Sequence, residues 1–277
     1  MRKIPYLHIL LFVLTFFSTL AVGAVHQGVN IIEKPFEIYK GFPFSATLLV
    51  ILLSHEFSHY ISSKKHHVVA TLPYFLPVPT FFGTLGAFIK MKSPITTKNA
   101  LVDIGASGPI AGFVVSIVAT VVGLSFSKVM PVVKAQEMIR LGDSLLFAGL
   151  TKLVVGTVPN NYDLYLHPIA FAGWIGFFVT FLNLIPIGQL DGGHIAYAFL
   201  GERHTKISKV LIAVLVLLGV FVYEGWLVWA VLLLVLGFRH PPIVYSEIPL
   251  DPRRKMIGYA AMAIFILTFT PVPIMIQ

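Results

Sequence analysis

The sequence contains no cysteine and has little charge for its length. The lack of cysteine excludes disulfides, a thiolate nucleophile and thiolate-bound metals, so histidine, aspartate and glutamate remain as ligands for a zinc ion. Charged residues make up 12% of the 277 residues, whereas a soluble domain has about 25%. The mean hydropathy is +0.87. We therefore exclude an ordinary soluble domain and expect a polytopic membrane protein.

The basic residues outnumber the acidic ones, which gives a formal net charge of +8. In a soluble protein this excess would make nucleic acid a candidate partner. Here the lysines and arginines are grouped between apolar runs, and the sequence has no glycine-rich phosphate loop or nucleic-acid-binding motif. We expect the lipid bilayer, and not nucleic acid, to meet the positive charge.

The apolar runs predict an all-α membrane protein of about seven transmembrane helices, in one membrane domain over residues 1–277. The first run, of about 20 residues, is longer than the roughly 7–15 apolar residues of a signal peptide, which favours a retained span over a cleaved signal. Tyr223 and Glu224 separate the fifth and sixth runs, which favours a tight helical hairpin over one long bent helix. The predicted spans are about 4–25, 43–63, 101–124, 167–190, 207–222, 225–238 and 255–275.

The lysines and arginines orient these spans. If seven spans alternate across the membrane, most basic residues, from Arg2 and Lys3 to Arg253 and Arg254, lie on one side. The positive-inside rule places that side in the cytoplasm. We therefore expect a multi-pass protein of the cell membrane with a cytoplasmic N-terminus.

Two connecting segments carry further information. Within residues 68–98, the first half is too rich in proline for a helix and too apolar for a solvated loop, and the second half alternates like a short strand. We expect a partly embedded β-like segment, which is tolerated at membrane depth beside protein or a water-filled cavity. Residues 125–166 predict a polar external loop with an amphipathic turn near 138–155.

The second apolar run contains an HExxH motif formed by His55, Glu56 and His59. These are the only charged or imidazole side chains in residues 42–61, and a charge at the bilayer centre costs about 2.5–3.5 kcal/mol even on lenient insertion scales. Residues i and i+4 share a helix face, so both imidazoles can bind one Zn²⁺ while the glutamate serves as general base. The motif predicts a zinc protease whose active site lies within the membrane, near its cytoplasmic side.

Asp191 is the leading candidate for the third zinc ligand. Spans two and four both run towards the cytoplasm, and the two motif histidines lie in the last turns of span two. Asp191 lies at the inner end of span four, hence at a similar depth. Its alternative role is an Asp-Gly turn that ends the helix.

Several other polar residues have less specific interpretations. Asp103 is interpreted as a helix N-cap. His194, three residues after Asp191, has an alternative as a partner of that ligand, but we favour an interfacial histidine. Histidines interpreted as headgroup-level residues include His66, His204 and His240.

The segments 55–59 and 183–194 together resemble the site-2 protease family of intramembrane zinc metalloproteases, over about residues 43–200. Gly108-Pro109 and the segment 83–88 also resemble family patterns. The resemblance implies a three-helix catalytic core, flanked by the helices near 4–25, 207–238 and 255–275. It also implies cleavage of transmembrane segments of other membrane proteins, in regulated intramembrane proteolysis. The site residues it implies are His55, His59 and Asp191 as ligands of one zinc ion per chain, Glu56 as the residue that activates water, and Asn183, Gly86 and Ala87 as positioners of the substrate.

The chain also departs from the common pattern of that family. Gly188 stands where many members have a second proline, and the loop at 125–166 is too short for the PDZ domain of many bacterial members. We also expect no CBS-type regulatory domain. Gly188-Gln189 and the segment 239–242 (Arg-His-Pro-Pro) are most similar to archaeal and plastid-type members.

Two functions of other classes compete with the protease. A metal-ion transporter also carries buried histidine and carboxylate, but transport needs polar positions along a route through the bilayer. The first, fifth, sixth and seventh spans are almost bare of such positions. An inactive membrane scaffold would be expected to lose Glu56 or a ligand, and all are present. The protease is therefore favoured, while its substrate and oligomeric state are left open by the sequence.

Overall fold

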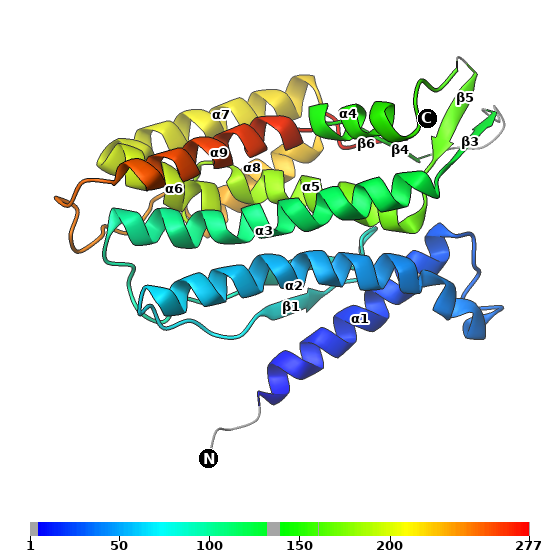
Figure 1. Ribbon diagram of the computed structural model, residues 1–277, viewed down its shortest axis with the longest axis horizontal. Helices are drawn as coiled ribbons and strands as arrows, with labels where there is room; N and C mark the ends of the chain where they lie inside the picture. The colour runs from blue at the N-terminus through cyan, green and yellow to red at the C-terminus, as the bar shows by residue number, and fades with distance from the viewer. Residues whose placement is uncertain (1–4, 132–138, 160, 277) are drawn as a thin grey trace.

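The computed structural model describes residues 5–131, 139–159 and 161–276 and is mostly helical (Figure 1). Arg2 and Lys3, which enter the orientation argument, lie outside these residues. Most helices run side by side along the long axis of the molecule, whereas α1 is tilted away from its neighbours towards the N-terminus (Figure 1).

The elements within the described residues are as follows. The α-helices are α1 (Tyr6–His26), α2 (Phe42–Lys65), α3 (Lys98–Ser125), α4 (Leu145–Val154), α5 (Pro168–Leu184), α6 (Asp191–Leu200), α7 (His204–Phe221), α8 (Gly225–Leu236) and α9 (Pro252–Thr268), with the 3₁₀ helices η1 (Pro35–Gly41) and η2 (Gly201–Arg203). The strands pair antiparallel: β1 (Tyr74–Pro77) with β2 (Thr84–Phe88), β3 (Lys128–Pro131) with β5 (Tyr162–Tyr165), and β4 (Ile139–Leu141) with β6 (Ile274–Ile276).

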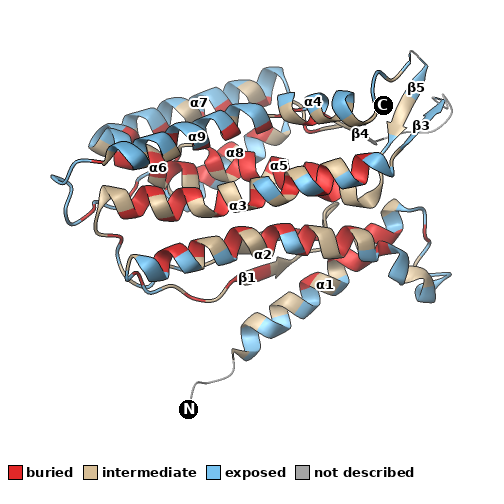
Figure 2. Cartoon of the chain, in the orientation of Figure 1, coloured by how far each residue is buried: buried red, intermediate tan, exposed pale blue. Residues whose placement is uncertain are grey.

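The core lies where α2, α3 and α5 pack together, and the buried residues gather on these helices (Figure 2). Small residues allow the close approach of α3 and α5. A Cβ atom on Gly173 would lie 2.3 Å from Thr120 Oγ1, and one on Gly123 would lie 2.0 Å from the backbone nitrogen of Ala170. Helices in a bilayer associate through such close backbone packing, because lipid provides no hydrophobic drive between them.

The outward faces of α7, α8 and α9 are apolar and exposed (Figure 2). Val228, Val231 and Val235 on α8 are examples. Among the residues that the structure describes, four helical segments are long and apolar enough to span a membrane by length and composition. They are Tyr6–His26, Pro35–Lys65, Lys98–Ser125 and Asp191–Phe221. Helices α5 and α8 are apolar but shorter. A membrane protein is therefore supported, while the count of seven spans stays a prediction.

The fourth predicted span, 167–190, is not one helix that ends at Asp191. Helix α5 ends at Leu184, a non-helical turn follows, and Asp191 begins α6. Pro186 has no N–H for a helical hydrogen bond, and Gly188 has φ of +57°, so the helix does not continue beyond Leu184. Asp191 therefore lies at the N-terminus of a further helix rather than at the inner end of a span.

The predicted hairpin at 207–238 is confirmed. Helices α7 and α8 are separate, and residues 222–224 connect them. They pack closely, because a Cβ atom on Gly219 would lie 2.5 Å from Leu227 Cγ. The alternative of one long bent helix is wrong. The last predicted span, 255–275, is shorter in the structure, since α9 ends at Thr268 and strand β6 follows.

The two connecting segments also contain regular structure. Strands β1 and β2 pair Phe75 with Ala87 and shift register before Thr84 pairs with Pro77, near Gly86 with its φ of +96°. The depth of this hairpin in a membrane stays a prediction. Residues 125–166 contain α4, whose first turn is capped by the Ser144 hydroxyl, within the range predicted for an amphipathic turn.

Candidate metal centre

Helix α2 presents His55, Glu56 and His59 in its second half, and all three are buried. The two histidines are one helical turn apart, so they point to the same side. That side faces the glycines of α3. A Cβ atom on Gly108 would lie 2.1 Å from His59 Nε2, and one on Gly112 would lie 3.2 Å from His55 Nδ1. The His59 imidazole therefore occupies space that only glycine at position 108 leaves free, and His55 fits tightly against Gly112.

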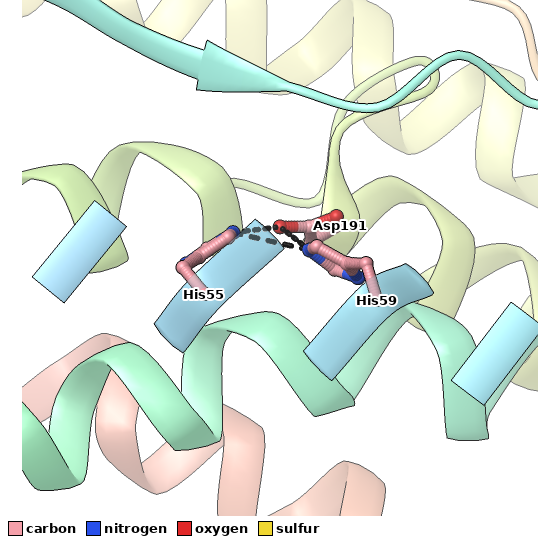
Figure 3. Close-up of side chains that lie close together, drawn as sticks. All are labelled: His55, His59 and Asp191. Atoms are coloured by element: carbon pink, nitrogen blue, oxygen red, sulfur yellow. Dashed lines mark hydrogen bonds and ion pairs between the residues drawn. The ribbon is translucent and has the colours of Figure 1, made fainter. Parts of the chain in front are cut away.

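Asp191 points between the two imidazoles from the start of α6 (Figure 3). Its Oδ2 atom lies 3.2 Å from His55 Nε2 and 3.2 Å from His59 Nε2, and the two Nε2 atoms are 3.0 Å apart. Three candidate ligand atoms from segments 132 residues or more apart therefore form a compact triangle. The structure brings these three predicted ligands together.

The triangle fits a zinc ion. A tetrahedral zinc with bonds of about 2.0–2.1 Å separates its ligand atoms by about 3.3 Å, close to the three distances observed. Two imidazole nitrogens and one carboxylate oxygen are a ligand set of catalytic zinc sites, which leave a fourth position open. The three residues could thus hold one metal ion.

The tautomer of His59 suits this role. Its Nδ1–H donates a hydrogen bond to the carbonyl oxygen of Ile104 on α3, at 2.8 Å. The lone pair is then on Nε2, the atom in the triangle. Histidine ligands commonly donate their other N–H to a backbone carbonyl in this way, which fixes the ring. Asn183, near the end of α5, has its Nδ2 atom 3.4 Å from His55 Nε2 and so lies beside the centre.

Glu56 directly follows His55 on α2 and is buried. Strand β2 packs against α2, so the hairpin lies beside the helix that carries the candidate general base. Gly86 and Ala87, the other two predicted positioning residues, lie on this strand. The side chain of Asp191 is 17% exposed, against 5% and 6% for the two histidines, so the aspartate is the most accessible of the three candidate ligands.

The turn before Asp191 explains the Asp-Gly-Gly sequence. A Cβ atom on Gly192 would lie 2.0 Å from the carbonyl oxygen of Leu184, and one on Gly193 would lie 2.4 Å from that of Gly188. Helix α6 therefore starts against the backbone that precedes it, and only glycine fits. Asp191 occupies the first turn, where the positive end of the helix dipole stabilises a carboxylate.

Two polar clusters near the centre differ from the interpretation of the sequence. Asp103 does not cap α3, because the cap is Thr97, whose side chain accepts from the N–H of Ala100. Asp103 instead accepts hydrogen bonds from Arg254 of α9 and lies 2.8 Å from His66 Nε2. It therefore ties three helix ends together.

The second cluster joins histidines that the sequence placed at the membrane interface. His194, His204 and His240 lie close together, and His204 and His240 are buried. His194 Nδ1 is 2.7 Å from His240 Nε2. Their depth in a membrane stays a prediction, but the structure adds contacts among them that the sequence did not predict. No short-range pattern indicated these contacts, since His194 and His240 are 46 residues apart.

Known proteins resemble this chain over most of its length. The sequence profile of peptidase family M50 matches residues 43–223. The chain is 30% identical over 239 residues to "Probable zinc metalloprotease EGY1, chloroplastic" of Arabidopsis thaliana, which covers 83% of this chain and 43% of that protein. It is 27% identical over 242 residues to "Probable zinc metalloprotease EGY2, chloroplastic" of Oryza sativa subsp. indica, with coverage of 86% and 44%. The chain thus spans less than half the length of these curated relatives.

Proposed function

The chain belongs to peptidase family M50, and from that premise we propose that it is an intramembrane zinc endopeptidase. The membership confirms the resemblance to site-2 proteases carried by segments 55–59 and 183–194. The proposed substrates are transmembrane segments of other membrane proteins, cleaved in regulated intramembrane proteolysis. The observation that supports this proposal best is the triangle of two buried imidazoles and one partly exposed carboxylate, with the buried Glu56 next to His55 in the sequence.

In this proposal His55, His59 and Asp191 hold one zinc ion. When bound, zinc supplies Lewis acidity towards a water molecule and towards the scissile carbonyl. Glu56 takes a proton from the water as its oxygen attacks the carbonyl carbon. The carbon–nitrogen bond then breaks, and Glu56 returns the proton to the leaving amine. Its burial beside the ligands keeps its carboxylate at the reacting atoms.

The hairpin of β1 and β2 offers a means of presenting the substrate to the centre. A helical substrate hides its carbonyl groups in hydrogen bonds between residues i and i−4, so it must unwind locally before cleavage. Strand β2 pairs with β1 on one side, and its other edge could pair with an unwound segment as an added strand. Gly86 and Ala87 would provide that edge. Asn183, beside His55, would orient the substrate strand by a hydrogen bond.

We also propose the orientation that the basic residues predict. The N-terminus and the connections 66–98, 201–203 and 237–251 would face the cytoplasm. The centre would then receive water from that side. The names of the relatives place those proteins in chloroplasts, so the corresponding compartment for a plastid protein would be the stroma.

The test is a paired measurement on detergent-purified protein. Zinc per chain and cleavage of a membrane-soluble reporter are measured for wild type and for Glu56→Gln. One zinc in both, with cleavage only in wild type, supports both the protease and the general base. Zinc in both without cleavage in either favours an inactive scaffold. Absence of zinc from wild type contradicts the proposed centre, and flux of metal ions that survives Glu56→Gln favours a transporter.

A further inference from the structure

The linker between α8 and α9, residues 237–251, is fastened to the elements that surround the centre. A Cβ atom on Gly188 would lie 2.3 Å from the carbonyl oxygen of Gly237, so the linker begins against the turn that precedes Asp191. Further along, the backbone N–H of Tyr245 donates to the carbonyl oxygen of Thr96. Two linker side chains, Ile243 and Leu250, are buried against α3 and α6. The linker is therefore anchored at several points, while residues 244–249 between Ile243 and Leu250 are exposed.

His240 makes the closest polar contact between this linker and α6. Its Nδ1 atom is 2.6 Å from the carbonyl oxygen of Pro241, and its Nε2 atom is 2.7 Å from His194 Nδ1. Its ring stacks on Tyr197 with the ring centroids 4.3 Å apart. These three contacts hold the imidazole on two sides and one face.

The direction of each hydrogen bond follows from the acceptors. A carbonyl oxygen only accepts, so His240 carries its proton on Nδ1 and donates it to Pro241. Burial lowers the pKa of His240 to about 4, so the imidazole is neutral at pH 7 and its Nε2 is an acceptor. His194 must therefore donate from Nδ1 to His240. His240 of the linker thus offers its Nε2 atom as an acceptor to the side-chain N–H of His194 on α6.

His194 is placed to transmit this contact to Asp191. It lies three residues after Asp191, about one turn along α6. Both residues pack against the same glycine of α3: a Cβ atom on Gly105 would lie 3.0 Å from the carbonyl oxygen of Asp191 and 3.0 Å from His194 Cβ. The first turn of α6 therefore contacts α3 directly and contacts His240 through His194.

We propose that His240 is a positioning residue that, through His194, holds the start of α6 so that the Asp191 carboxylate stays in the ligand triangle. The inference rests on the proposed function, since it assigns a role relative to that metal centre. Loss of a residue that orients a metal ligand commonly lowers metal affinity about 10–100-fold. The same range is expected for the loss of the His240 acceptor.

Two substitutions separate the hydrogen bond from the packing. His240→Gln keeps an acceptor that can reach His194, whereas His240→Phe keeps a ring that can stack on Tyr197 but has no acceptor. Arg239→Ala is the matched control, because Arg239 is the exposed neighbour of His240 on the same linker. The zinc affinity of each variant is measured by chelator competition, and the visible spectrum is measured with cobalt(II) in place of zinc.

We expect His240→Phe to lower the zinc affinity about 10–100-fold and to change the cobalt spectrum. His240→Gln and Arg239→Ala should stay close to wild type. If His240→Phe reduces folding, the double variant with His194→Phe removes the unpaired donor as well. That double variant should bind zinc no more weakly than the single one, because both lose the same contact.

Two results would overturn the inference while leaving the proposed function intact. One is a folded His240→Phe protein with the zinc affinity and cobalt spectrum of wild type. The other is an equal loss in His240→Gln and His240→Phe, since packing and not the hydrogen bond would then matter. A wild-type protein that binds no zinc and cleaves nothing would overturn the proposed function, and this inference with it.

Discussion

Replacement of Gly108 by alanine should destroy the metal centre through a single methyl group. The added Cβ atom would lie 2.1 Å from His59 Nε2 and 2.4 Å from Cδ2 of the same ring, whereas ordinary contacts begin at 3.4 Å. The imidazole would have to retreat by more than an ångström. Metal–ligand distances are held within about 0.2 Å. His59 would therefore leave either the triangle or its hydrogen bond to Ile104.

The loss of zinc in Gly108→Ala is not expected to come from a less stable α3. Alanine is more favourable than glycine in a helix by about 0.8–1.0 kcal/mol, so α3 alone would gain stability. Gly112→Ala is the matched control on the same helix face, because its Cβ atom would lie 3.2 Å from His55 Nδ1. That contact is tight, but a shift of a few tenths of an ångström relieves it. The two variants therefore differ mainly in how far an imidazole must move.

The assay is zinc per chain together with cleavage of a membrane-soluble reporter. Gly108→Ala should purify as a folded protein with little zinc and no measurable cleavage. Gly112→Ala should retain zinc and most of the cleavage. A Gly108→Ala protein with one zinc per chain and wild-type cleavage would refute the reasoning, because His59 would then not need the place that the structure gives it.

Three further predictions follow from the same geometry. Asp191→Ala removes one corner of the triangle and should abolish zinc binding, and a full zinc content by elemental analysis would exclude Asp191 as a ligand. Proline substitutions through residues 85–89 should cripple cleavage of a membrane substrate but retain zinc, and unchanged cleavage would contradict strand addition to β2. Asp103→Asn weakens charged hydrogen bonds to Arg254, worth about 1.5–3 kcal/mol each when well buried and less here, since both side chains are partly exposed. It should lower the midpoint of thermal unfolding in detergent without loss of zinc, and an unchanged midpoint would contradict the role of that cluster.

The sequence predicted α2 nearly to its ends, as 43–63 against Phe42–Lys65. An apolar run of this length has one good solution in a bilayer, since a helix satisfies every backbone group within the segment. The HExxH spacing then fixes which face carries both imidazoles, because i and i+4 lie on one side. Helix existence and the relation between two residues on one helix are local properties, and local pattern is sufficient for them.

The end of α5 was indicated by local residue types, but the continuous apolar run led to the prediction of one longer span. Pro186 and Gly188 both disfavour a continuous helix, yet the apolar run extends across them to Leu190. Length and hydropathy therefore gave one span, 167–190, where the structure has α5, a turn and α6. Asp191 still lies beside the two histidines, as the argument from similar depth expected, because the turn places the start of α6 against α2.

A single sequence does not indicate which side chains from distant segments contact one another. Asp103 and Arg254 are 151 residues apart, and His194 and His240 are 46 apart. Composition and periodicity describe each helix but do not determine which helix packs beside it. For that reason Asp103 was interpreted as a local cap, and the contacts among His194, His204 and His240 were not predicted.

One stripe of α3 both packs the helices and shapes the centre. Gly105, Gly108 and Gly112 are spaced by three and four residues, so they lie on one helix face. Added Cβ atoms would meet Asp191 or its helix at the first, His59 at the second and His55 at the third. Each glycine therefore faces one of the three proposed ligands. In a bilayer, small residues are also what lets helices approach closely. The packing that brings α2 and α6 onto α3 consequently sets the distances in the triangle, and Gly108, where a Cβ atom would come closest to a ligand, matters most.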